Sequence, residues 1–263
     1  MRSRFVPKRS TLIATMTLIG AIFVHVQTAL ASENQKAGSK DALSVLLVGN
    51  SHLLMPGFTK RLMRSLKTQA GGKRAVSLKV VAKIGTTLTK SRKKSSTLVA
   101  MRAKTWDVIV LQESTTAFMT NHGRKNFLAA VAWFHKNKPA ASKLLLWQAW
   151  PQGSSHALYY RRGVWGRWFK NPPKNPNQLF TWISAGAKRA ADANDVFISP
   201  IGHCWMSLPK RKRPYAGDDY HPSGRGLTFI AETLASSVVA TSAGQSGDDK
   251  RLIGTCPTAR KKK

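Results

Sequence analysis

The segment Leu43–Gly57 reads L-S-V-L-L-V-G-N-S-H-L-L-M-P-G and joins an apolar run to a turn. The run Val45–Val48 predicts a buried strand, because a short aliphatic and β-branched stretch that stops at a turn is typical of one. Apolar residues then recur at helical spacing, at Phe58, Leu62, Met63 and Leu66. A strand, a tight turn and a helix would lift the hydroxyl of Ser51 above the carboxyl edge of a sheet, where open α/β folds place their chemistry. A helix-capping role for Ser51 explains the same pattern, since serine is favoured at that position.

The rest of the chain alternates strands with helices. Further strands are predicted at 76–84, 106–111, 143–147 and 196–198, and helices at 127–135, 179–191 and 227–239. Residues 90–96 and 202–217 are expected to be loops. This alternation predicts βαβ units, and therefore an α/β three-layer sandwich with a central, mostly parallel five-stranded sheet.

The first 31 residues have the pattern of a secretory signal peptide. Arg2, Arg4, Lys8 and Arg9 precede an apolar stretch, and Ala29-Leu30-Ala31 supplies the small residues of a cleavage site. We expect 1–31 to be removed and 32–42 to be a linker, which leaves an exported protein, periplasmic or extracellular, without a membrane span. An uncleaved N-terminal anchor is the alternative.

The charge is strongly positive, with 43 Lys and Arg against 11 Asp and Glu. Without the four basic residues of the predicted signal peptide, the formal net charge of +32 becomes +28. Such a surface attracts polyanions without specificity, whereas adaptation for solubility or habitat explains the same charge without a partner.

The two cysteines, Cys204 and Cys256, lie far apart in the sequence. An even number of cysteines in an exported protein predicts a disulfide, and two unpaired buried thiols are the alternative. Neither cysteine lies in a C-x-x-C pattern or near a histidine cluster, so the sequence predicts no metal site.

Polar residues follow three of the predicted strands, at Gly49-Asn50-Ser51, Gly85-Thr86 and Gln112-Glu113. The carboxyl ends of parallel strands lie at one edge, so these turns are expected to meet. A fourth segment, Asp218-Asp219-Tyr220-His221-Pro222, precedes the last helix. An aspartate three residues before a histidine can hold its imidazole in the tautomer that leaves the other nitrogen free as a base.

These motifs resemble the SGNH hydrolase superfamily, the GDSL-type esterases and lipases, in which a G-D-S or G-N-S turn and a D-x-x-H-P motif occur in this order. The resemblance covers about 43–240 and implies a flavodoxin-like catalytic domain. It implies Ser51 as nucleophile, His221 as general base and Asp218 as its orienting carboxylate. It also implies an oxyanion hole formed by the N–H groups of Ser51 and Gly85 and the amide of Gln112.

The third block departs from the usual G-x-N-D pattern of that superfamily. This chain has V-L-Q-E-S, which is similar to a branch with V-L-Q-E whose last block reads D-G-S-H-P in place of D-D-Y-H-P. Gln112 presents the same amide as asparagine on a longer arm. Three neighbours of these motifs have simpler interpretations: Asp219 as a helix cap, Glu113 as a carboxylate without a catalytic part, and His52 as a residue that faces solvent or packs on the helix.

A long aromatic and basic loop is predicted at 151–176, and a basic, irregular tail at 241–263. Candidate substrate-binding residues in or beside the loop are Trp147, Trp150, Tyr159, Tyr160, Arg161 and Trp165. Aromatic faces suit sugar rings and cations suit carboxylates, although a lid packed on its own aromatic residues gives the same composition.

Together these features favour a secreted serine esterase that needs no cofactor and acts on carboxylic esters, with O-acetyl groups of an extracellular glycan as one candidate substrate. Two alternatives remain: an acyltransferase on the same scaffold, and a basic polyanion-binding protein whose site is vestigial.

Overall fold

The computed structural model describes residues 42–72, 74–160, 169, 171–247 and 251–257. The predicted signal peptide at 1–31, most of the predicted linker, and the candidate residues Arg161 and Trp165 lie outside these described residues.

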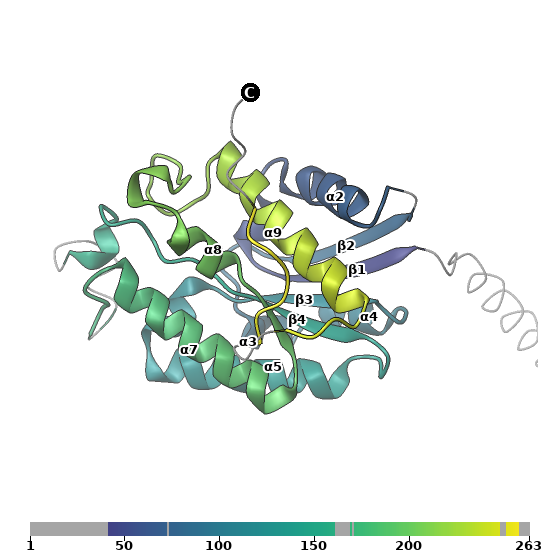
Figure 1. Cartoon of the computed structure of the whole chain (residues 1–263). Coiled ribbons are helices and arrows are strands. Elements are labelled where there is room, and N and C mark those ends of the chain that lie inside the picture. Colours follow the sequence, from purple (N-terminus) through teal and green to yellow (C-terminus); the bar gives the residue numbers. More distant parts are fainter. Residues whose placement is uncertain (1–41, 73, 161–168, 170, 248–250, 258–263) are drawn as a thin grey trace, which may run out of the picture. The chain divides into compact units, whose positions relative to one another are not determined.

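The described residues fold around one parallel sheet, as the alternating pattern predicts (Figure 1). Its strands are β1 (Leu43–Gly49), β2 (Val76–Ala82), β3 (Val108–Gln112), β4 (Lys143–Trp147) and β5 (Phe197–Ser199), in the order β2-β1-β3-β4-β5. The register pairs Gly49 with Ala82 and Val48 with Leu111. The ends of β1, β2 and β3 therefore lie side by side at the carboxyl edge.

Helices cover both faces of the sheet. Figure 1 shows α2 (Phe58–Gln69) and α9 (Gly224–Ser242) on one face, and α5 (Asn121–Asn137) and α7 (Pro176–Asn194) on the other. Alternate residues of β1 enter the two resulting cores: Leu46 and Val48 join one, whereas Val45 and Leu47 join the other. All four side chains are fully buried. The predicted three-layer α/β fold is confirmed.

The structure contains short helices where the sequence predicts loops. In the first region α3 (Leu88–Ser91) and α4 (Ser95–Arg102) flank a short turn, and in the second α8 (Ile201–Ser207) follows β5. Four 3₁₀ helices complete the described elements, η1 (Ser51–Leu54), η2 (Thr115–Met119), η3 (Ala157–Tyr159) and η4 (Lys210–Lys212). The short helices form because tertiary burial of Leu88, Met101 and Trp205 outweighs the weak local signal.

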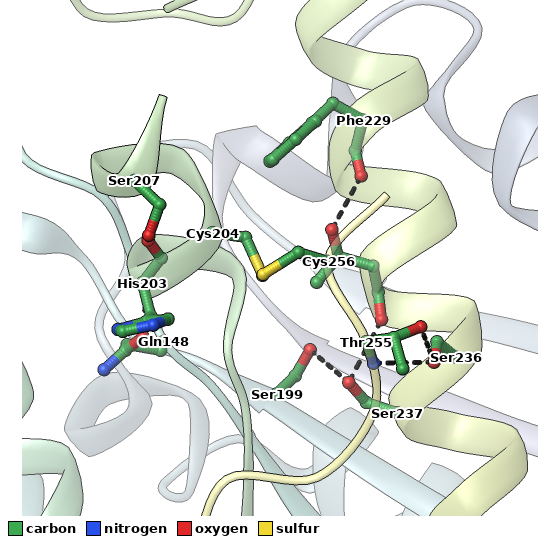
Figure 2. Close-up of a disulfide and its surroundings, with 11 residues drawn as sticks. Gln148, Ser199, His203, Cys204, Ser207, Phe229, Ser236, Ser237, Thr255 and Cys256 are labelled. Carbon is green, nitrogen blue, oxygen red and sulfur yellow. Dashed lines mark hydrogen bonds between the residues drawn. A yellow bond between two sulfur atoms is a disulfide. The ribbon is translucent and has the colours of Figure 1, made fainter. Parts of the chain in front are cut away.

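The described residues beyond α9 have little regular structure, as the sequence predicts, but they pack on the domain. Leu252 bridges Ile198 of β5, and Ile253 is buried in the core. Cys256 forms a disulfide with Cys204 of α8 (Figure 2). The backbone N–H of Thr255 donates to Ser236 Oγ of α9 at 2.9 Å. The tail therefore extends the sheet edge and is linked covalently to α8.

None of the helices within the described ranges is both long enough and apolar enough to cross a membrane.

Candidate active site

The turn Gly49–Ser51, called the serine turn below, is held by hydrogen bonds on both sides of Ser51. The Asn50 N–H donates to Gln112 Oε1 at 2.8 Å, and the His52 N–H donates to Asn50 Oδ1 at 3.2 Å. The Leu53 N–H donates to the Asn50 carbonyl at 3.1 Å. The Ser51 N–H makes no hydrogen bond to the described part of the chain. It is therefore the donor of this turn that is available to an anionic oxygen.

Gln112 supports the serine turn, which corrects the expectation that its amide lines an oxyanion hole. The side chain is only 1% exposed. Its Oε1 accepts from Asn50, and its Nε2 donates to the Glu113 carbonyl at 2.7 Å. Because both ends of the amide are engaged inside the fold, Gln112 acts by cross-linking the ends of β1 and β3.

Gly85 lies in an exposed loop after β2 with a φ of 65°, a left-handed conformation that glycine adopts without a steric penalty. Its N–H also makes no hydrogen bond to a described residue. The loop ends at Leu88, whose N–H donates to Glu113 Oε2 at 3.1 Å. Since Lys83 N–H also donates to the Gly49 carbonyl at 3.4 Å, this loop is fastened beside the serine turn.

Glu113 is a buried carboxylate that fastens this loop. It is 2% exposed, and its Oε1 accepts from the Ser114 N–H at 2.6 Å. Burial raises the pKa of Glu113 to about 7, although the N–H groups of Ser114 and Leu88 partly oppose the shift. Both carboxylate oxygens accept hydrogen bonds from backbone N–H groups, so the side chain holds the loop to the end of β3.

Asp218 and His221 form a dyad within the segment Ala216–His221, called the histidine loop below. His221 Nδ1 lies 2.5 Å from Asp218 Oδ2, and the backbone N–H of His221 donates to Asp218 Oδ1 at 2.9 Å. Partial burial acts to raise the pKa of Asp218, but the hydrogen bonds from His221 and Tyr220 outweigh it and hold this pKa below its usual value. The carboxylate stays ionised and keeps the proton on Nδ1, which leaves Nε2 free to act as a base.

Asp219 fastens the histidine loop to the segment after β4. Its φ is 55°, in the left-handed region that favours glycine. The similar D-G-S-H-P motif has glycine at the corresponding position. The Gly153 N–H donates to the Asp219 carbonyl at 2.7 Å, and the Ser155 N–H donates to Asp219 Oδ2 at 2.9 Å. A Cβ on Gly153 would collide with the Asp219 carboxylate. Asp219 is therefore a clasp, and Ser223 caps α9 in its place.

His52 packs beneath the histidine loop, which corrects the expectation that it faces solvent or packs on the following helix. It is 3% exposed, and its ring centroid lies 5.0 Å from Trp150, 5.3 Å from Tyr220 and 5.8 Å from His221. Burial lowers the pKa of His52 to about 4, and the charge of nearby His221 adds to this effect. Neither ring nitrogen has a hydrogen-bond partner in the described structure. His52 is thus a neutral shelf for the His221 ring.

The serine turn and the histidine loop meet through this shelf, because His52 directly follows Ser51 and contacts the His221 ring. Ser51 Oγ and His221 make no hydrogen bond to each other in the structure. In unliganded sites catalytic hydrogen bonds are often long or poorly aligned and tighten only when a substrate binds.

Among the described aromatic residues proposed to bind substrate, three of the four are wholly or largely buried. Trp147 and Trp150 are 5% and 1% exposed, so they present no ring face to a ligand, and Trp150 stacks on Trp205 with centroids 4.9 Å apart. Tyr159 is largely buried, and its hydroxyl donates to the Gln152 carbonyl at 2.9 Å. Tyr160 is 57% exposed and remains accessible to a ligand.

The described residues contain no group of three or more histidine, cysteine, aspartate or glutamate side chains arranged to hold a metal ion.

No protein-family model matches the sequence, and no curated protein does either. Solved structures share its fold. A protein of Slackia heliotrinireducens, provisionally assigned to the SGNH hydrolases, has a TM-score of 0.60 and 20% identity over 74% of this chain and 97% of that one. A lipase/acylhydrolase of Enterococcus faecalis gives 0.55 and 14% over 76% and 96%. A catalytic mutant of an acetylxylan esterase of Geobacillus stearothermophilus gives 0.56 and 11% over 77% and 96%. The chain has the fold of the SGNH hydrolases, as its motifs predict.

Proposed function

We propose that this protein is a serine hydrolase of carboxylic esters, with Ser51, His221 and Asp218 as its catalytic triad. The observation that carries the proposal is the convergence at one sheet edge of a serine with an unpaired N–H and a histidine whose Nδ1 is held by a carboxylate. The fold shared with lipases and esterases supports it.

In the proposed reaction, His221 Nε2 takes the proton of Ser51 Oγ as this oxygen attacks the ester carbonyl carbon. The tetrahedral oxyanion accepts hydrogen bonds from the N–H groups of Ser51 and Gly85. The C–O bond to the alcohol then breaks, and the alcohol leaves with the proton from His221. Water attacks the acyl-enzyme, His221 takes a proton from the water, and the carboxylic acid leaves as Ser51 Oγ recovers its proton.

Asp218 stabilises the imidazolium that forms in both steps without taking a proton itself. The hydrogen bonds from His221 and Tyr220 hold the pKa of Asp218 below its usual value and so favour the ionised carboxylate that this role requires.

We further propose that the enzyme works outside the cytoplasm and that its substrate is an O-acetylated glycan. The disulfide between Cys204 and Cys256 supports an oxidising location. The likeness to an acetylxylan esterase supports the substrate class.

The test is reaction with a fluorophosphonate probe followed by peptide mapping, together with turnover of a small acetyl ester. We expect the label on Ser51, and Ser51→Ala should abolish labelling and lower kcat by at least about 10⁴-fold. Unchanged turnover in a correctly folded Ser51→Ala protein would contradict the mechanism. Adding an acceptor sugar and analysing the products separates hydrolysis from acyl transfer.

A further inference from the structure

A cavity of about 400 Å³ opens beside the histidine loop, where Asp219 is one of its lining residues. It is lined by three structural groups: the segment Gly153–Ser155 after β4, the first residues of α7, and the basic 3₁₀ helix η4 with the residues that follow it. Asp219, the lining residue from the histidine loop, directly follows Asp218 of the dyad in the sequence. Its volume lies in the usual range of small-ligand pockets.

The cavity lining has more basic than acidic side chains. Lys210, Arg211 and Arg213 line the cavity against one carboxylate, that of Asp219. The guanidinium of Arg213 donates to the carbonyls of Leu208 and Met206, so its side chain is held in place by the backbone. The side chains of Lys210 and Arg211 are exposed and make no hydrogen bond or ion pair with the described residues.

The remaining lining suits hydroxyl groups and adds to the positive potential. Asp219 Oδ2 accepts from Ser155, which leaves Oδ1 as an acceptor for a ligand hydroxyl. Ser154 and Ser155 add hydroxyls of their own. The N-terminus of the 19-residue helix α7 carries a partial positive charge and faces the same cavity through Pro176 and Asn177.

From this arrangement we propose that the cavity is a subsite for a carboxylate-bearing sugar residue of the acylated glycan. Lys210 and Arg211 would pair with the carboxylate, while Asp219 Oδ1 accepts a hydroxyl of the ring. The role in catalysis rests on the proposed ester hydrolase, but binding of the glycan does not. A ligand in this subsite would contact the clasp that orients Asp218 and His221.

The test compares three full-length proteins in the Ser51→Ala background, which binds but does not turn over: the unaltered chain, Lys210→Glu/Arg211→Glu, and the control Lys125→Glu/Lys136→Glu. The control makes the same change of charge on exposed residues of α5. Binding is measured by titration calorimetry at fixed salt with polygalacturonate, which carries carboxylates, and with neutral xylan.

We expect the double substitution at 210 and 211 to raise the Kd for polygalacturonate by at least about tenfold, whereas the control raises it less than about twofold. Equal weakening by both variants would show general polyanion attraction and would overturn the subsite. Equal weakening for xylan and polygalacturonate would also overturn it, because the cations would then not select for charge.

Activity is then compared in proteins that retain Ser51. The ratio of kcat/KM on acetylated polygalacturonate to that on acetylated xylan should fall about tenfold in Lys210→Glu/Arg211→Glu. If no ester is turned over while carboxylate binding still depends on Lys210 and Arg211, the hydrolase proposal fails and the subsite stands. If esters are turned over and this ratio does not change, the subsite fails and the hydrolase stands.

Discussion

The serine turn and the histidine loop of the proposed active site are held in place by different interactions. The serine turn follows β1, whose core-facing side chains are fully buried, and Gln112 fixes it from the neighbouring strand. The histidine loop lies near the surface, where the side chains of His221 and Asp218 are 36% and 49% exposed. It is fastened by the Asp219 clasp and by packing on His52.

Under the proposed mechanism, this difference predicts that substitutions in the two segments affect stability and turnover to different degrees. A change at the serine turn disturbs buried packing and should cost both folding free energy and turnover. A change at the histidine loop breaks a few exposed contacts and should lower turnover with little effect on stability. The substitutions below test that contrast, from the largest expected effect to the smallest.

Gly49→Ala should damage both properties. A Cβ at this position would lie 2.5 Å from Gln112 Oε1 and 2.8 Å from Leu53 Cδ1. Because Gln112 is buried and cross-links the turn, it has no room to yield. We expect the free energy of unfolding to fall by about 3 kcal/mol and kcat/KM by about 100-fold. Chemical denaturation and ester kinetics measure both, and a stable variant with normal kinetics would break the comparison.

Glu113→Gln should change how stability depends on pH. Burial raises the pKa of Glu113 from 4.5 to about 7, so the folded protein binds this proton more tightly than the unfolded chain. Its contribution is therefore fully present below pH 4.5 and is lost as the pH rises through about 7. The unfolding free energy of the native protein minus that of Glu113→Gln should fall by about 3 kcal/mol over this window.

Urea denaturation of both proteins at several pH values measures this difference, and every other titrating group cancels in it. A difference that stays constant between pH 4.5 and 7 would show that Glu113 is not buried as a high-pKa carboxyl in the folded protein.

Gly153→Ala should lower turnover without lowering stability by much. The new methyl group would displace the Asp219 carboxylate and open the clasp beside Asp218. We expect kcat to fall about tenfold, with a change in unfolding free energy of less than about 1 kcal/mol. Thermal unfolding and kinetics on a small acetyl ester measure the two effects.

The matched control is Gly153→Ala combined with Asp219→Gly. Removing the carboxylate removes the collision, and glycine adopts the φ of 55° found at position 219 without strain. The Ser155–Asp219 side-chain bond is lost with the carboxylate, but the Gly153 N–H bond to the carbonyl of residue 219 does not need that side chain, so we expect the double variant to recover part of the lost turnover. A double variant as slow as Gly153→Ala alone would show that the collision is not the cause.

His52→Phe tests the shelf under the His221 ring and has the smallest expected effect. Phenylalanine keeps the flat packing surface and removes two buried nitrogens that have no partner in the described residues. We therefore expect a gain of about 1 kcal/mol in unfolding free energy at pH 8, with kcat retained within about threefold. Loss of turnover as large as that of His221→Ala would mean that the imidazole takes part in the reaction and is more than a shelf.

Sequence patterns predicted the fold and the order of the site motifs because these depend on local properties. The apolar run before Ser51 and the spacing of the strands suffice to define a parallel sheet whose turns share an edge. The separation of three positions from Asp218 to His221 suffices to let the carboxylate reach Nδ1, since both lie in one tight loop.

The roles of Gln112, Asp219 and His52 depended on residues far away in the chain. The Asn50–Gln112 hydrogen bond spans 62 residues, and the Ser155–Asp219 bond spans 64. A hint of the clasp was present, since the similar D-G-S-H-P motif has glycine where Asp219 adopts a left-handed backbone. Nothing local indicated the burial of His52, because its neighbours Trp150 and Tyr220 come from other segments.

The sequence by itself thus determined the strands, the helices and which turns carry a hydroxyl, an imidazole and a carboxylate, because periodicity and turn chemistry act over a few residues. Only the tertiary structure decided which hydrogen-bond partners each polar side chain has. A buried amide or carboxylate takes whichever partner the packed fold places beside it, and that partner is set by strand register and loop packing. For this reason Gln112 braces the serine turn, while the N–H groups of Ser51 and Gly85 remain available to a substrate.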